Sequence, residues 1–83
     1  MTEVDGFQLE AFARPDHPGS EHFWPCVRVV GPALNVVHGF LKESLPEFDS
    51  KDKRSVIAAA EVVIAKVNSV THTDLTRVNL GLR

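Results

Sequence analysis

The side chains best suited to metal or nucleophilic chemistry are four histidines and one cysteine: His17, His22, His38, His72 and Cys26. Structural zinc sites take four Cys or His ligands at short, typical spacings. His22 and Cys26 are four residues apart, but Pro25 interrupts the extended segment between them, and the chain has no Cys-x-x-Cys or His-x-x-x-His pair. The sequence therefore predicts no metal site and no bound cofactor.

Cys26 would be a nucleophile only if a neighbouring base lowered its pKa. No glycine-flanked elbow or helix start follows it, so a buried, unreactive thiol is the preferred interpretation. The carboxylates of Glu43, Glu47 and Asp49 cluster in a polar connector, where a solvated surface is typical. The chain also lacks Gly-x-Gly-x-x-Gly and phosphate-binding loops. We expect no catalytic residue and no enzymatic activity.

The segment Phe23-Trp24-Pro25 is the strongest candidate for contact with another protein. Adjacent residues of a strand point to opposite faces, so one of the two aromatic rings should face solvent or a partner. Phe and Trp are also enriched in protein interfaces. The alternative is that both rings are covered, one by the sheet and one by the loop at 15–21. The candidate partner-binding residues are Phe12, Phe23, Trp24 and Arg28.

A basic cluster at the start of an expected helix is the second candidate. Lys51, Lys53 and Arg54 would lie at the partially positive helix end, where cations are unfavourable and where a phosphate or carboxylate would bind well. Arg77 and Arg83 would extend this anion-binding or acidic-partner surface if the C-terminal strand runs nearby. The alternative is that the upstream acidic residues at 43, 47 and 49 neutralise the cluster.

The elements that must position these residues follow from hydrophobic spacing. Two-residue alternation predicts strands at 6–14 and 22–30, joined by a proline- and glycine-containing loop, and a C-terminal strand at 76–83. Apolar residues at helical spacing predict a long helix at 50–69, capped by Asp49 or Ser50. This helix has few charges on its outer side, which predicts that a sheet, a second helix or a partner chain covers most of its circumference. The fold class is therefore a small two-layer α+β domain, with an antiparallel sheet packed on the long helix.

The segment 33–45 is ambiguous. A helix is preferred, because Pro32 suits the first helical position, Pro46 suits a stop, and the apolar spacing is closer to helical than to alternating. A third strand is the alternative, since two adjacent valines favour a strand and Gly39 weakens a helix.

Size and composition exclude several classes of protein. Eighty-three residues form a single domain, 1–83, with 43% hydrophobic and 24% charged residues, as in ordinary globular proteins. The sequence has no apolar run long enough to span a membrane, no signal peptide is expected, and the lone cysteine suits a cytoplasmic location. Residues 1–50 carry a net charge of −5 and residues 51–83 a net charge of +3. This asymmetry indicates either internal compensation or a bipolar, self-associating surface.

Two functions follow as hypotheses. The first is a non-enzymatic interaction module, an inhibitor or adaptor that binds another protein and forms a homodimer or other homo-oligomer. Small accessory proteins of phages and mobile elements, including anti-CRISPR inhibitors, are similar as a class, although no shared motif supports the comparison. The second is a nucleic-acid binder, because a short sheet with one basic helix start resembles the double-stranded-RNA-binding architecture in topology. A net charge of −2 disfavours this alternative.

Overall fold

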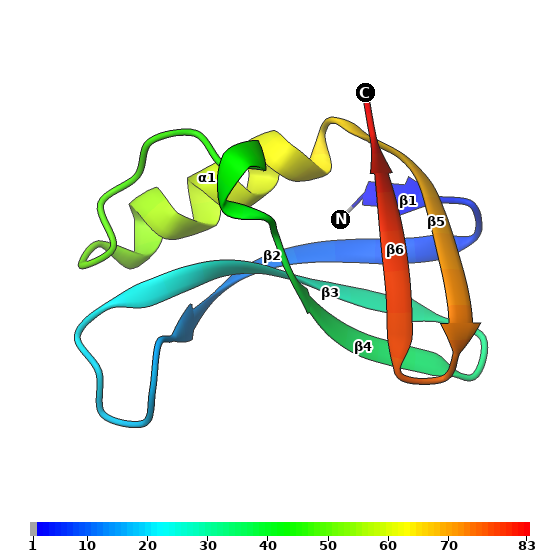
Figure 1. Ribbon diagram of the computed structural model, residues 1–83, viewed down its shortest axis with the longest axis horizontal. Coiled ribbons are helices and arrows are strands. Elements are labelled where there is room, and N and C mark those ends of the chain that lie inside the picture. The colour runs from blue at the N-terminus through cyan, green and yellow to red at the C-terminus, as the bar shows by residue number, and fades with distance from the viewer. Residues whose placement is uncertain (1) are drawn as a thin grey trace.

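Four antiparallel strands form the main sheet of the structure, a computed structural model that describes residues 2–83 (Figure 1). The strands are β1 (Thr2–Val4), β2 (Phe7–Pro15), β3 (Phe23–Gly31) and β4 (Leu34–Gly39), and they lie side by side in chain order. The hairpin expected from residues 6–14 and 22–30 is confirmed as β2 and β3. Its loop at 16–22 carries Pro18 and Gly19, which disfavour a continued strand.

Strand β1 was not predicted from the sequence, and a tight turn at Asp5 and Gly6 joins it to β2. Both turn residues have positive φ, 52° and 83°. Asp-Gly is the dipeptide that two-residue hairpin turns favour, and it was the available signal for this strand. The carboxylate of Asp5 also accepts a hydrogen bond from the backbone N–H of Val70 at 2.9 Å, which fixes the turn to the C-terminal part of the chain.

The preferred helix over 33–45 is wrong, and the alternative, a third strand of the sheet, is confirmed as β4. A two-residue turn at Pro32 and Ala33 brings Leu34 opposite Gly31, so the chain continues antiparallel to β3. The adjacent valines Val36 and Val37 suit a strand because their branched side chains pack well on a pleated surface. Only a short 3-10 helix, η1 (Lys42–Ser44), follows.

The expected long helix is shorter than residues 50–69. Helix α1 spans Lys53–Ile64, and its N-cap is Asp52, whose carboxylate accepts a hydrogen bond from the N–H of Arg54 at 3.0 Å. Asp49 and Ser50 are therefore not the cap. The buried residues of α1 recur at helical spacing as predicted, and they are Val56, Ala59, Ala60, Val63 and Ile64. The outer side of the helix, at residues 58, 61, 62 and 65, is exposed.

Residues 67–69, which were expected to end the helix, instead begin β5 (Val67–Asp74), and this strand pairs with β6 (Arg77–Leu82). The C-terminal strand is thus confirmed, but it joins a separate two-stranded sheet. The register shifts between Val67 and Ser69, and this irregularity lets Val67 and Val70 both face the core. Their spacing of three residues matches that of one helix face, and for this reason the predicted helix extended too far.

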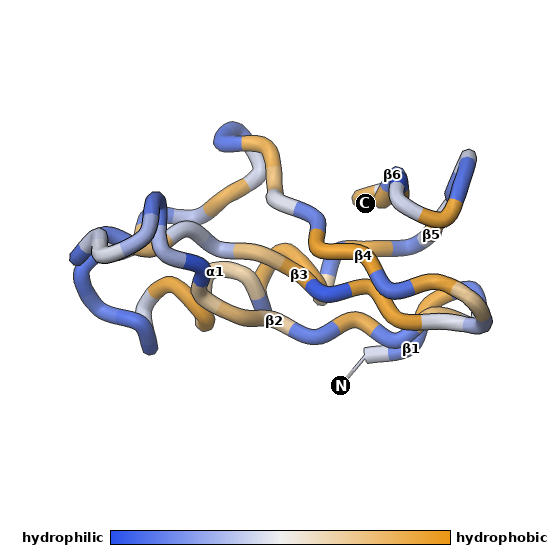
Figure 2. The backbone as a smooth tube through the Cα atoms, turned by 90° about the horizontal axis from the view of Figure 1, so that it is seen from below, coloured by the Kyte–Doolittle hydropathy of each residue, from blue (hydrophilic) through white to orange (hydrophobic). Residues whose placement is uncertain are grey.

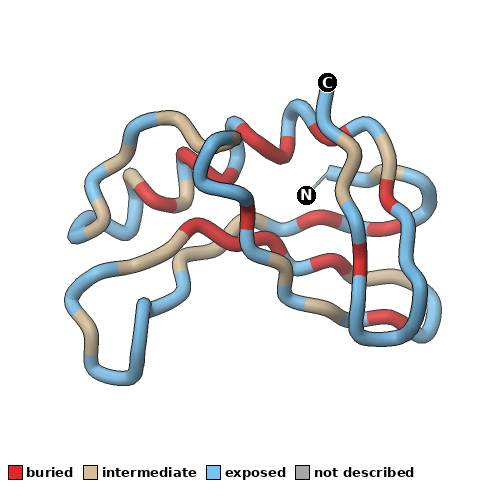
Figure 3. Tube along the Cα trace, viewed as in Figure 1, coloured by how far each residue is buried: buried red, intermediate tan, exposed pale blue. Residues whose placement is uncertain are grey.

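Helix α1 and the β5–β6 hairpin cover the same face of the four-stranded sheet. The helix packs on β2 and β3, while β5 approaches β1 and β6 approaches β4 (Figures 1 and 2). Buried and exposed residues alternate from Phe7 to Glu10 of β2, whereas three consecutive residues of β3, Pro25, Cys26 and Val27, are all buried (Figure 3). Leu9, Val27 and Val29 lie at the centre of this core and are at most 1% exposed. Among residues 2–83, no helix is long and apolar enough to cross a lipid bilayer.

Candidate functional site

Phe23 and Trp24 point to opposite faces of the sheet, because they are neighbours on β3. Phe23 belongs to the face that α1 covers, and its ring lies 4.9 Å from the Nζ of Lys53 in the first turn of the helix. Trp24 belongs to the other face, which we call the open face: the side of the β1–β4 sheet turned away from α1. Both rings are half-buried, so neither is fully covered.

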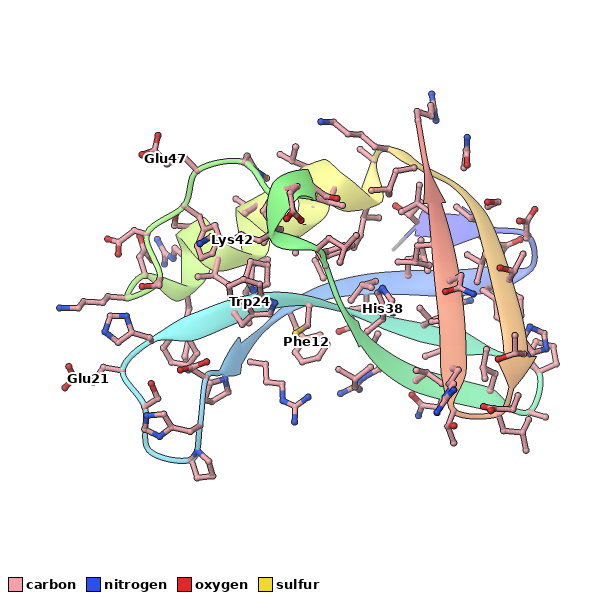
Figure 4. The ribbon with its side chains drawn as sticks, in the orientation of Figure 1. Phe12, Glu21, Trp24, His38, Lys42 and Glu47 are labelled. Atoms are coloured by element: carbon pink, nitrogen blue, oxygen red, sulfur yellow. The ribbon has the colours of Figure 1, made fainter. Side chains whose placement is uncertain are left out.

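Trp24 stands between two hollows in the surface. The first, of about 440 Å³, is bounded by Trp24, Cys26, Gly39 and the loop at 14–18. The second, of about 260 Å³, lies between Trp24 and the connector at 42–48. Phe48 from this connector meets the indole edge-on, with ring centroids 6.2 Å apart. The contact orients the indole, and Trp24 remains only half-buried (Figure 4 labels its side chain).

The strand register brings Phe12 and Arg28 onto the open face with Trp24. Phe12 lies opposite Cys26, and Arg14 lies opposite Trp24, and directly opposed residues in an antiparallel pair share a face. The guanidinium of Arg28 stacks on the Phe12 ring at 5.6 Å from its centroid. Three of the four predicted partner-binding residues therefore share one surface, and the fourth, Phe23, does not.

Val37 adds an apolar side chain to the open face and was not predicted. It lies opposite Arg28 on β4 and is 43% exposed. Its position on the sheet was missed because a helix was the preferred prediction for residues 33–45. Phe48 was missed for a different reason: it lies in an irregular connector, where no periodicity indicates its contact with Trp24.

Cys26 lies at the bottom of the larger hollow and is 2% exposed. Burial raises the pKa of this thiol, and the nearby Arg14 opposes the effect in part. A raised pKa keeps the group protonated and poorly nucleophilic, as the buried-thiol interpretation requires. Within residues 2–83, no three His, Cys, Asp or Glu side chains are grouped so that they would hold a metal ion.

The predicted basic surface is divided between two parts of the molecule. Lys51, Lys53 and Arg54 are exposed at the start of α1. This region is tied to β3 by a hydrogen bond from the N–H of Phe23 to the carbonyl of Ser50, at 2.8 Å. Arg77 begins β6, in the hairpin at the other end of the domain (Figure 1). The structure does not bring these cations together.

Arg83 follows β6, and its backbone N–H donates to the carbonyl of Lys66, just beyond the C-terminal end of α1. It therefore also lies a helix length away from the cluster at 51–54. Within that cluster, the carboxylates of Asp49 and Asp52 accept backbone N–H groups of Lys51 and Arg54, each at 3.0 Å. These acids offset the unfavourable position of the cations at the helix start.

Comparison with known proteins gives no independent assignment: no protein-family model, curated protein or solved structure matches the chain. The open face is therefore assessed on its own geometry. It offers a fixed indole, a guanidinium stacked on a phenyl ring and an exposed valine, flanked by two hollows.

Proposed function

We propose that the protein is a small non-enzymatic interaction module, an inhibitor or adaptor that docks another protein on the open face around Trp24. The observation that supports it most is the meeting of Phe12, Trp24 and Arg28 on one exposed surface. Trp and Arg are the residue types most enriched among interface hot spots. An indole anchored by Phe48 also loses little side-chain freedom on binding, which lowers the entropic cost of association.

The two hollows beside Trp24 suit side chains of a folded partner. Such anchors fill pockets at the centre of an interface, and a surrounding polar rim excludes water from them. Here, Arg14 and Asp16 line one hollow, and Lys42 and Glu47 line the other. The rim carries both signs of charge, and this mixture favours a polar protein surface over a uniformly anionic nucleic acid.

The test is affinity capture from the native host with immobilised wild-type protein, followed by binding measurements on the purified partner. Trp24→Ala should weaken binding at least about tenfold, or about 1.4 kcal/mol, as expected for a hot-spot residue. Phe12→Ala is a second variant on the same face. Val62→Ala, on the exposed side of α1, is the matched control and should bind as the wild type does.

Circular dichroism and thermal unfolding establish that each variant is folded before binding is compared. Equal affinity of the wild type and both open-face variants contradicts the proposal. Loss of binding in a Lys51/Lys53/Arg54→Ala variant, with Trp24→Ala unaffected, would assign the site to the helix start instead. Salt-sensitive binding of duplex RNA or DNA by the wild type would favour the nucleic-acid alternative.

A further inference from the structure

The outer edge of β4 is a regular strand edge without a charged residue. It lies at the border of the four-stranded sheet and hydrogen-bonds only to β3 (Figure 1). Its six residues, Leu-Asn-Val-Val-His-Gly, include no Lys, Arg, Asp, Glu or Pro, and its register with β3 is regular. Exposed edges of folded proteins are usually protected by charge, proline, a bulge or short length. None of these protects β4.

The other strand edges are protected. On the opposite border of the sheet, β1 is only three residues long and carries Glu3, and the stretch of β2 that β1 leaves unpaired carries Glu10, Arg14 and Pro15. In the second sheet, β5 has two register shifts, and Asp5 already accepts the N–H of Val70. Strand β6 carries Arg77. The contrast singles out β4 as the edge that can accept another strand.

The backbone groups available on this edge follow from the turn that precedes it. Because two residues, Pro32 and Ala33, connect the strands, Gly31 and Leu34 form a hydrogen-bonded pair. Hydrogen-bonded and non-hydrogen-bonded pairs alternate along an antiparallel ladder. The residues of β4 whose N–H and C=O groups point outward are therefore Asn35, Val37 and Gly39.

We propose that β4 pairs antiparallel with β4 of a second copy of this chain, about a two-fold axis at Val37. This inference goes beyond the proposed function and assigns a surface to the self-association that the sequence predicts. In this register Val37 faces Val37 of the partner subunit, and Asn35 faces Gly39 of the partner subunit. All three outward-facing residues on each chain are then paired, which gives about six backbone hydrogen bonds and one continuous sheet.

The charges near β4 favour pairing with a second copy of the chain over pairing with an acidic or a basic peptide. In the row through the axis, Val37 is followed by Arg28 on β3 and Glu10 on β2. The two Arg28 side chains would be separated by two uncharged strands, about 14 Å at normal strand spacing, which exceeds the screening length of about 8 Å at physiological salt. The edge therefore presents no repulsion to its own copy and no charge that would select a charged segment.

The test is size-exclusion chromatography with light scattering over a concentration series up to hundreds of micromolar. Wild-type protein should reach twice the mass of one chain. Val37→Lys should remain monomeric, because two ammonium groups would face each other across the axis. Val62→Lys, at a position that is 45% exposed against 43% for Val37, is the matched control and should dimerise normally.

Val37→Pro removes an outward N–H that β3 does not use, so the variant should fold but not dimerise. If it fails to fold, Val37→Lys decides the result. Hydrogen exchange of the backbone amides tests the proposed register. Protection of the Val37 amide should rise with protein concentration. The amide of Val36, which bonds to β3, should be protected at every concentration.

A strict monomer at the highest concentration overturns the inference. So does a dimer that survives Val37→Lys but is lost in Val62→Lys, since that result would place the contact on α1. Trp24→Ala should dimerise as the wild type does. A normal dimer without partner binding therefore contradicts only the open-face proposal, whereas a monomer that still binds its partner through Trp24 contradicts only the edge pairing.

Discussion

Ala33 adopts a backbone conformation that favours glycine. It is the second residue of the Pro32-Ala33 turn and has φ of 58°, as the corresponding position of a type II turn requires. A Cβ atom in the left-handed region costs about 1–2 kcal/mol. Ala33→Gly should therefore raise the free energy of unfolding by about 0.5–1 kcal/mol, after allowance for the greater freedom of glycine in the unfolded chain. Urea unfolding measures the change, and a destabilised variant would contradict the turn assignment.

His38 couples stability to pH. It lies opposite Val27 on the covered face of the sheet, and burial lowers its pKa below the usual 6.5. The unfolded chain therefore binds the proton more readily than the folded chain does. The contribution of His38 to the free energy of unfolding is fully present above about pH 6.5. It is lost as the pH falls toward the lower pKa of the folded state.

The measurement is the free energy of unfolding between about pH 8 and about pH 5. His38→Gln should flatten the decline on the acid side, because the amide cannot be protonated. His17→Gln, in the exposed loop after β2, controls for the removal of a histidine and should retain the wild-type slope. An unchanged slope in His38→Gln would show that another group is responsible.

At the scale of single elements, α1 depends on its cap. The Asp52 carboxylate satisfies the N–H of Arg54 and also lies favourably at the positive helix end, beside Lys53. Asp52→Ala should lower the free energy of unfolding by about 1 kcal/mol, and Asp52→Asn, which retains an accepting oxygen, by less. Chemical denaturation compares the two variants. Equal losses would mean that charge, not the accepted hydrogen bond, stabilises this helix start.

Local patterns predicted the elements whose residues follow one period, and failed where geometry interrupts that period. The alternation of Val78 and Leu80 identified β6, and the spacing from Val56 to Ile64 identified α1. Val67 and Val70 led to a predicted helix that is too long, because the irregularity at the start of β5 places both side chains toward the core. The pairing of β6 with β5 was missed although the two strands form a local hairpin, because residues 67–69 were assigned to the helix and no strand was predicted before residue 76.

Across the whole molecule, the candidate site was predicted in composition but not in arrangement. The sequence identified Phe12, Trp24 and Arg28 one by one, yet their common face depends on the β2–β3 register. The division of charge also coincides with the layers: the acidic residues 1–50 supply the four-stranded sheet and its connector, and the basic residues 51–83 supply α1, β5 and β6. The two layers therefore carry opposite net charges.

The hydrogen bond between Asp5 and Val70 has a consequence for the order of folding. It joins residues 65 positions apart, and β5 and β6 complete the cover over a sheet that begins at residue 2. During synthesis, the β2–β3 hairpin can form early, but its apolar face stays partly exposed until residues 67–82 have been made. The first turn of the protein therefore reaches its native state late, and long-range contact formation, rather than local propensity, should limit the folding rate.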